Sequence, residues 1–393
     1  MKYDFDKTPD QSGSGAIKYD AREAVFGNAN IIPMWIADMD FEAAPFIYEA
    51  LTERAKHHTY GYGLHDDDYW NAYAGWLERR GGWKTSREWM DFTSGVVAGF
   101  SYAIRALTDE GDGIVIMPPI YPPFASQIEI NNRKVIYNEL LRGPDRYEID
   151  FADLEEKLKT ARAFILCNPH NPTGRVFSRE ELIRIGELCC KYDVAIISDE
   201  IHSDLVYKPN KHLHIAALDE RFAERSVTFV APSKTFSVAG LAASIAITPG
   251  EEMRNKLRKE LGYLHIQMGN LFETAAIKAA YTKGDEWVDQ VCEYMNGNME
   301  FACRFLSENL PELKTFRPEG TYFLWIDFSG LGMAAEELAR FMASEAGVGL
   351  SMGGFGPGSE GFMRMNMATS RATVGKALDQ IKSAWQRNKA SVK

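Results

Sequence analysis

A lysine follows an apolar run at a position where it could act as a nucleophile. Lys234 comes four residues after the run Ser226–Val230, among small and hydroxyl-bearing residues. A lysine in such surroundings can lose part of its hydration, which lowers the pKa of its amine and makes the amine nucleophilic. A solvated surface lysine is the commoner explanation for any single lysine. Other residues must therefore support the assignment.

Asp199 ends a second apolar run, Ala195–Ser198. A carboxylate at the end of a buried strand is costly unless a cation accompanies it. A protonated pyridine nitrogen would supply such a cation through a charge-assisted hydrogen bond. The alternative is an aspartate that caps the N-terminus of a following helix. His202, three residues later, is ambiguous by itself.

Two loops could bind the oxygen atoms of a ligand. Asn171 lies in NPHNPTG (Asn168–Gly174), where two Asn-Pro pairs fix the backbone, and its amide suits a phenolate oxygen or a carboxylate. Gly95 and Val96 lie in SGVVAG (94–99), where backbone N–H groups and a helix N-terminus would favour an anion such as phosphate. A structural loop explains the first motif, and a tight turn that uses glycine for steric reasons explains the second.

The elements that position these residues are short apolar runs alternating with helical patterns between about residues 90 and 250. In several runs both alternating sets of side chains are apolar, which is typical of strands covered on both faces of a sheet. One helix is expected at Ser178–Tyr192, where Ser178 can cap and Glu181 follows three residues later. The alternation predicts an α/β fold with a mainly parallel sheet sandwiched by helices, whose strand ends bind ligands. The expected strands are Trp89–Thr93, Gly113–Met117, Lys134–Asn138, Ala163–Cys167, Ala195–Ser198, Val227–Val230 and Ala243–Thr248.

The C-terminal third has a different pattern, which predicts a smaller α+β unit. We expect an N-terminal segment (1–45) packing with a small C-terminal domain (285–393), and a large domain (46–284) between them. The elements expected in the small domain are the helix Asp285–Leu310, the strand Thr321–Asp327, the helix Ala334–Ala346, a strand at Phe362–Met367 and the helix Thr373–Asn388.

Composition narrows the class of protein. The formal net charge of −11 disfavours binding to nucleic acid or to an anionic membrane surface. No stretch approaches 18 consecutive apolar residues, and the N-terminus lacks the apolar core of a signal peptide. Five scattered cysteines form no C-x-x-C pair and suit a reducing compartment. We therefore expect a cytoplasmic enzyme that acts on a small molecule.

The phosphate loop, asparagine, aspartate and lysine, in that order, resemble the class I/II aminotransferase superfamily of pyridoxal-phosphate enzymes (fold type I) along essentially the whole chain. The resemblance implies a large domain with a seven-stranded sheet and a smaller α+β C-terminal domain. Within the superfamily, five segments are similar to the cystathionine β-lyase or C–S lyase branch: MWIADMDF (Met34–Phe41), YGYG (Tyr60–Gly63), DEIHSDL (Asp199–Leu205), SKTFSVAGL (Ser233–Leu241) and PEGTYFLW (Pro318–Trp325).

The resemblance implies roles for the residues that touch the cofactor ring. Lys234 would bind pyridoxal phosphate covalently and later act as the base at Cα. Asp199 would keep the pyridine nitrogen protonated, and Asn171 would bond the phenolic oxygen. Tyr121, in PPIYPPF, matches the aromatic residue that stacks on the ring, and it could protonate a departing sulfur. His202 is expected beside the cofactor.

The resemblance also implies how the phosphate and the substrate are held. Gly95 and Val96 would donate backbone N–H groups to the phosphate, and Ser233 would add a hydroxyl. Tyr60 would reach the phosphate from the neighbouring subunit of a homodimer with shared active sites. Arg364, in FMRMNMA, matches the arginine that grips the α-carboxylate of a small amino-acid substrate.

Two residues depart from the usual aminotransferase pattern, and both favour the lyase branch. Ala242 stands where many aminotransferases have a phosphate-binding arginine, and His202 replaces the usual tyrosine. We therefore expect a C–S β-lyase that cleaves cystathionine or related S-substituted cysteines to thiol, pyruvate and ammonia. An aminotransferase with a 2-oxo acid acceptor is the alternative. A non-enzymatic cofactor-binding regulator would usually carry a DNA-binding region, of which the sequence shows neither a helix-turn-helix pattern nor a basic face.

Overall fold

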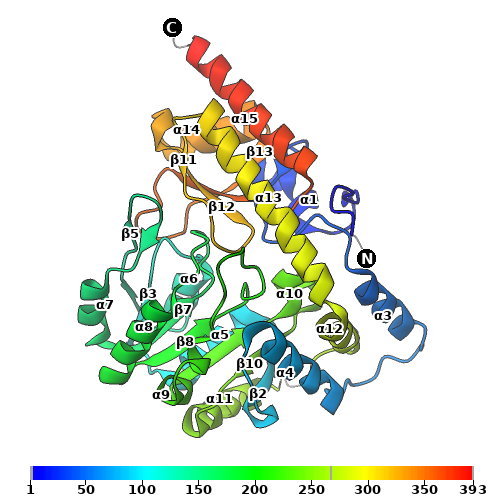
Figure 1. The fold of residues 1–393 in the computed structure, drawn as a ribbon, viewed down its shortest axis with the longest axis vertical. Coiled ribbons are helices and arrows are strands. Elements are labelled where there is room, and N and C mark those ends of the chain that lie inside the picture. Colours follow the sequence, from blue (N-terminus) through cyan, green and yellow to red (C-terminus); the bar gives the residue numbers. More distant parts are fainter. Residues whose placement is uncertain (1–2, 266–267, 392–393) are drawn as a thin grey trace.

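A seven-stranded sheet forms the centre of the larger part of the molecule (Figure 1). The structure is a computed structural model that describes residues 3–265 and 268–391. The strand order is β2-β10-β9-β8-β7-β3-β4, and β10 alone runs antiparallel to its neighbours. All seven expected strands are confirmed, with ends that move by at most two residues. Their bounds are β2 Met90–Thr93, β3 Gly113–Ile116, β4 Lys134–Tyr137, β7 Ala161–Cys167, β8 Ala195–Asp199, β9 Ser226–Val230 and β10 Ser244–Ile247.

Helices cover both faces of this sheet, because most of its strands have apolar side chains on both faces. On one face, Ile165 and Ile197 pack with apolar residues of α5 (Val96–Leu107), α6 (Pro123–Ile130) and α11 (Glu251–Leu264). On the other, the alternate strand residues pack with apolar residues of α7 (Phe151–Leu158), α8 (Arg179–Lys191) and α9 (Glu220–Glu224). The expected helix after Ser178 is confirmed as α8, which begins with the capping box of Ser178 and Glu181.

A four-stranded antiparallel sheet organises the C-terminal part. Its order is β11 (Lys314–Thr315), β12 (Phe323–Asp327), β15 (Phe362–Asn366), β14 (Ser351–Met352). The long helices α13 (Asp285–Asn309) and α15 (Arg371–Ser391) lie side by side along it, as Figure 1 shows. The helix expected at Ala334–Ala346 is two pieces: α14 (Ala335–Arg340) and a π-helical turn, η5 (Phe341–Ala346).

The N-terminal segment contacts the C-terminal part of the chain. After the short helices α1 (Ile17–Asp20) and α2 (Arg22–Phe26), β1 (Ile32–Pro33) pairs in parallel with β13 (Val348–Gly349). The Phe5 ring packs edge-on against those of Phe41 and Trp287. We retain the division into 1–45, 46–284 and 285–393 as a proposal.

The remaining elements are four helices, a small hairpin and several 3₁₀ turns within the described ranges. No helix in the described ranges is long and apolar enough to cross a membrane. A small hairpin, β5 and β6, was not predicted from the sequence. The bounds are α3 Pro45–Ala55, α4 Asp67–Gly81, α10 Pro232–Thr235, α12 Leu271–Lys283, β5 Leu141–Arg142, β6 Tyr147–Glu148, and the 3₁₀ turns η1 Arg87–Trp89, η2 Ile215–Ala217, η3 Ala239–Leu241 and η4 Ser329–Leu331.

Candidate active site

The sheet topology brings the polar strand-end residues to one edge. Since β10 is antiparallel to both β2 and β9, strands β2, β3, β7, β8 and β9 all point the same way. Their carboxyl ends are followed by Gly95, Tyr121, Asn171 and Lys234, and Asp199 is itself the last residue of β8. The sheet thus places these sequence-predicted residues together at the edge where open α/β sheets bind ligands.

Lys234 lies on the single turn α10 and is half-buried. Its Nζ donates a hydrogen bond to the Ala37 carbonyl oxygen at 2.7 Å. The pKa of the amine is lowered to about 8: burial is the main cause and Arg364 adds to it, while Asp38 and Asp199 oppose the shift. The Lys234 amine is therefore a nucleophile and base near neutral pH.

Asp199 is 5% exposed and lacks a cationic partner within 4 Å among the described residues. Its Oδ1 accepts a hydrogen bond from the Ile201 backbone N–H at 3.1 Å. Burial raises the pKa of this carboxyl to about 7, and the charge of Glu200 adds to the shift. Residues 201–204 form turns, so the alternative of a helix-capping aspartate is wrong. A cationic group of a ligand would relieve this buried charge.

Arg364 is buried on β15 without a carboxylate partner in the part of the chain that the structure describes. Its Nη1 donates to Asn171 Oδ1 at 2.9 Å, and Nη2 donates to the Trp35 carbonyl oxygen at 3.2 Å. Its Nε has no hydrogen-bond partner within the described ranges. Burial lowers the pKa of the guanidinium to about 10, so it remains charged at neutral pH. The arrangement fits an anionic ligand such as an α-carboxylate.

Aromatic and imidazole groups surround these charges. Tyr121 is half-buried, and burial raises the pKa of its hydroxyl, as does the charge of Asp199. His202 is buried against the rings of Tyr322 and Phe323, with centroids 5.6 and 5.5 Å away. Burial first, then the charges of Lys234 and Arg364, hold its pKa well below the usual range. The imidazole is therefore neutral, and its Nδ1 has no protein partner.

The start of α5 supplies the expected anion-binding groups. Gly95 is the N-cap at φ 104°, a backbone conformation that favours glycine, and Val96 begins the helix. The first N–H groups of a helix have no acceptor within it. Ser233 is half-buried on α10, and Ala242 lies beyond it at φ 51° in a left-handed turn. These residues fit a phosphate held by backbone N–H groups rather than by an arginine at 242.

Tyr60 lies apart from these residues within the protomer. Its ring is 60% exposed and stacks on Phe272, and its hydroxyl donates to the Ala55 carbonyl oxygen at 2.8 Å. Its expected contact with a phosphate in a partner subunit stays a prediction.

Sequence reasoning missed a histidine cluster behind Asp199. Glu200 Oε2 accepts hydrogen bonds from His212 Nε2 at 2.9 Å and from His214 Nδ1, and all three side chains are buried. Ser198 Oγ donates to the other oxygen of Glu200 at 2.8 Å. The two imidazoles outweigh burial and hold the pKa of Glu200 below its usual value. The cluster therefore satisfies its own hydrogen bonds without a metal ion.

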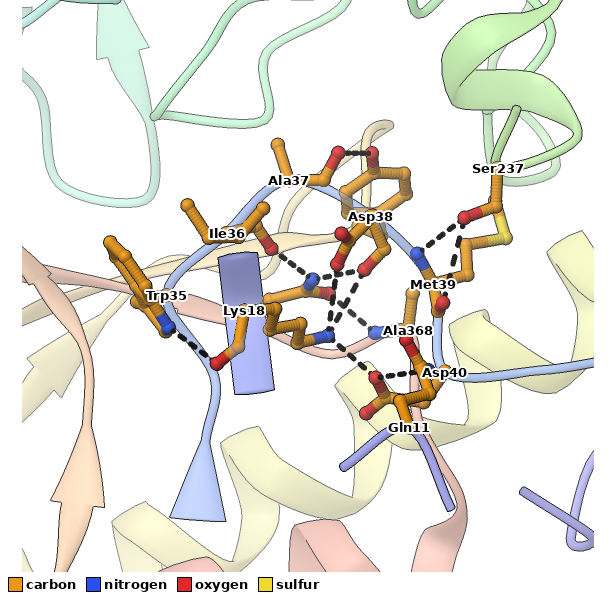
Figure 2. A network of polar contacts seen from close by, with 12 residues as sticks. Gln11, Lys18, Trp35, Ile36, Ala37, Asp38, Met39, Asp40, Ser237 and Ala368 are labelled. Carbon is orange, nitrogen blue, oxygen red and sulfur yellow. Dashed lines mark hydrogen bonds and ion pairs between the residues drawn. The ribbon is translucent and has the colours of Figure 1, made fainter. Parts of the chain in front are cut away.

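Sequence reasoning also missed the residues around Ala37 (Figure 2). MWIADMDF was noticed only for its resemblance to a family. In the structure its backbone contacts Lys234, and the Tyr322 hydroxyl donates to the Ala37 oxygen at 2.9 Å. The signal was a pair of aspartates, Asp38 and Asp40, inside an otherwise apolar stretch.

The site fits the cofactor that the resemblance implies. The buried carboxylate of Asp199 suits a protonated ring nitrogen, Arg364 Nε and His202 Nδ1 have no hydrogen-bond partner among the described residues, and the start of α5 suits a phosphate. The amine of Lys234 at the same edge is available for a covalent bond to an aldehyde.

The chain belongs to the family of class I and II aminotransferases, whose model matches residues 30–381. Among individual relatives, it is 44% identical to cystathionine beta-lyase PatB of Bacillus subtilis (strain 168), over 97% of this chain and 99% of that protein. It is similar to a PLP-bound putative aminotransferase from Clostridium difficile 630 (TM-score 0.96, 40% identity, 98% and 100% of the two chains covered). It is also similar to cystalysin from Treponema denticola, which contains pyridoxal 5'-phosphate (TM-score 0.95, 32% identity, 98% and 100% covered). These findings confirm the expected superfamily and the fold type.

Proposed function

We propose that this protein is a pyridoxal-phosphate-dependent C–S β-lyase that cleaves cystathionine or related S-substituted cysteines to thiol, pyruvate and ammonia. The observation that carries the proposal is the buried Asp199 carboxylate, which lies with the amine of Lys234 at one sheet edge and has no cationic partner among the residues that the structure describes. The 44% identity to a cystathionine beta-lyase over nearly the whole chain supports the choice of reaction.

Each residue has a role that its surroundings support. Arg364 binds the substrate α-carboxylate, and the Lys234 amine, with its lowered pKa, takes the proton from Cα. Bound pyridoxal phosphate supplies the electron sink for the pair left at Cα. Asp199 holds a proton at the ring nitrogen. Because burial raises the pKa of Tyr121, its hydroxyl stays protonated and can donate to the departing sulfur.

Product analysis tests the reaction. L-Cystathionine incubated with the enzyme alone should give pyruvate and free thiol in equal amounts, without a 2-oxo acid acceptor. Parallel incubations with several amino acids plus 2-oxoglutarate test for transamination. If turnover requires the 2-oxo acid, the protein is an aminotransferase and the proposed lyase reaction is wrong.

We also propose a homodimer in which Tyr60 completes the phosphate site of the partner. Tyr60, Tyr62 and Leu64 are 60%, 90% and 76% exposed, so this segment presents apolar side chains that a second copy could cover. Lys234→Ala and Tyr60→Ala should each be nearly inactive alone. When the two are unfolded together and refolded, half the dimers are mixed, and one site in each is intact. About a quarter of wild-type activity should return.

A monomer, or a Tyr60 that serves its own chain, gives no recovery in that experiment. A fully active Tyr60→Ala variant would also contradict the shared site.

We further propose a cytoplasmic location, which the free thiols of all five cysteines support. Cell fractionation with an antibody against the protein would test this, and recovery from the culture medium would contradict it.

A further inference from the structure

The segment Trp35–Asp40 lies between the Lys234 turn and the C-terminal sheet, and side chains from both sides bind its backbone (Figure 2). Ser237 Oγ accepts from the Met39 N–H at 2.8 Å. Asn366 Nδ2 donates to the carbonyl oxygens of Ile36 and Asp38 at 2.6 Å each. The backbone from which the Asp38 side chain projects is therefore held from both sides.

A buried lysine holds the two aspartates of this segment. Lys18 is 1% exposed, and its Nζ lies 2.8 Å from Asp40 Oδ1, 3.2 Å from the Asp38 carbonyl oxygen and 3.4 Å from Asp38 Oδ1. Figure 2 shows the ammonium between the two carboxylates. One buried cation between two carboxylates leaves a negative charge in excess.

Asp38 is the less compensated of the two carboxylates, and burial raises its pKa. The Asp40 side chain is 3% exposed and takes the shorter contact to Lys18, a hydrogen bond from Gln11 Nε2 at 3.5 Å and an interaction with the Tyr19 hydroxyl. The Asp38 side chain is 30% exposed, and its Oδ1 has only the longer ion pair with Lys18, at 3.4 Å, among the described residues. The charged and titratable groups that act on Asp38 or respond to it are Lys18, Asp40, Tyr19, Tyr322 and Lys234.

Of the two carboxylates that raise the pKa of Lys234, Asp38 has a larger effect than Asp199. Lys234 already donates to the carbonyl oxygen of the preceding residue, Ala37. The other charged groups near its amine are Arg364 and Asp199, and the neutral imidazole of His202 lies close by. In the proposed reaction Asp199 binds the ring nitrogen, and Arg364 repels a cation. Asp38 is then left to stabilise the ammonium that forms when Lys234 takes the Cα proton.

We propose that Asp38, together with the Ala37 carbonyl, is a positioning site for the protonated amine of Lys234, and that Lys18 fixes the carboxylate in place. The proposal rests on the proposed function, because it assigns Asp38 a part in the proton transfer by Lys234. It adds a residue of the N-terminal segment to the groups that set the charge of this lysine.

A pH titration of the visible absorption of the cofactor-loaded enzyme tests this directly, since that absorption reports the protonation of the Lys234 nitrogen. Asp38→Asn should lower the midpoint by about 1 pH unit, because removing a nearby carboxylate makes the protonated nitrogen less favourable. Asp40→Asn, the matched control in the same network, should lower it by at most about a third of that. In steady-state assays Asp38→Asn should lower kcat about tenfold and leave KM within about twofold.

An unchanged midpoint in Asp38→Asn would overturn the proposal. Equal shifts in the two variants would also overturn it, because the effect would then come from the segment's structure and not from the Asp38 charge. If Asp38→Asn does not fold, Asp38→Ser removes the same charge and should shift the midpoint alike. The proposed function is tested separately by wild-type product analysis, so its failure is recognised before any variant is compared.

Discussion

Replacing Asp199 by asparagine removes a carboxylate that the fold buries without a cation among the described residues. Burial raises the pKa of this carboxyl from 3.8 to about 7. At about 1.4 kcal/mol per pH unit, ionised Asp199 costs the cofactor-free protein about 4 kcal/mol. The native state binds the proton more tightly than the unfolded chain does, so stability falls as pH rises from 3.8 to about 7. Above about pH 7, the full cost of ionised Asp199 lowers the unfolding free energy of the cofactor-free protein.

Asp199→Asn should therefore stabilise the cofactor-free protein while it inactivates the enzyme. The gain in unfolding free energy should be about 4 kcal/mol at pH 8 and about 2 kcal/mol at pH 5. Urea unfolding at the two pH values measures it. In the loaded enzyme the neutral amide cannot hold a proton at the ring nitrogen, so kcat/KM should fall by about 10²–10³-fold.

Glu200→Gln is the matched control, for which we expect a change in unfolding free energy of the opposite sign. Its two histidine partners hold the pKa of Glu200 below its usual value, although burial alone would raise it. Ionised Glu200 therefore stabilises the native state above about pH 5, and the glutamine variant should be less stable than wild type at pH 8. The reasoning about Asp199 is refuted if Asp199→Asn shows the wild-type pH dependence of stability, or keeps kcat/KM within about twofold.

Three further changes test other parts of the site. Arg364→Lys should raise KM about 100-fold, because lysine cannot form the two-pronged contact with a carboxylate; an unchanged KM would contradict its role. Lys18→Met should lower the unfolding free energy by about 3–5 kcal/mol, because it leaves the buried carboxylate of Asp40 unpaired; denaturant titration at pH 7 measures the loss. Lys234→Ala should lose the visible absorption and take up no label on borohydride reduction, and label on another lysine would refute the attachment site.

The sheet and its polar edge could be predicted because their signals are local. A strand buried on both faces is an uninterrupted apolar run, and each run here ends at a turn-forming or polar residue. Asp199, Asn171 and Lys234 stand out because each lies at the end of such a run or within four residues after it, where a polar side chain needs a partner if it is buried. Because the strands are parallel, their carboxyl ends lie at one edge of the sheet, so the sequence alone predicts that these residues lie close together.

The residues around Lys18 could not be predicted in this way. The contacts of Lys18 with Asp38 and Asp40 depend on how the N-terminal segment lies against the C-terminal sheet, and no periodicity encodes that approach. The two-residue strands β1 and β13 are too short to show alternation. The cluster of His212 and His214 appears only when its loop folds back on β8.

The pairing of β1 with β13 has a consequence for the order of synthesis. Ser351 bonds the Trp35 carbonyl oxygen across 316 residues of sequence, and Arg364, which bonds the same oxygen, is made later still. At about 5–20 residues per second, a ribosome needs about 15–60 s to make the intervening chain. During that time the buried lysine, the two aspartates and the apolar N-terminal residues lack the strands that cover them. The first forty residues of a nascent chain therefore reach their native contacts only after the last strand of the C-terminal sheet has been made.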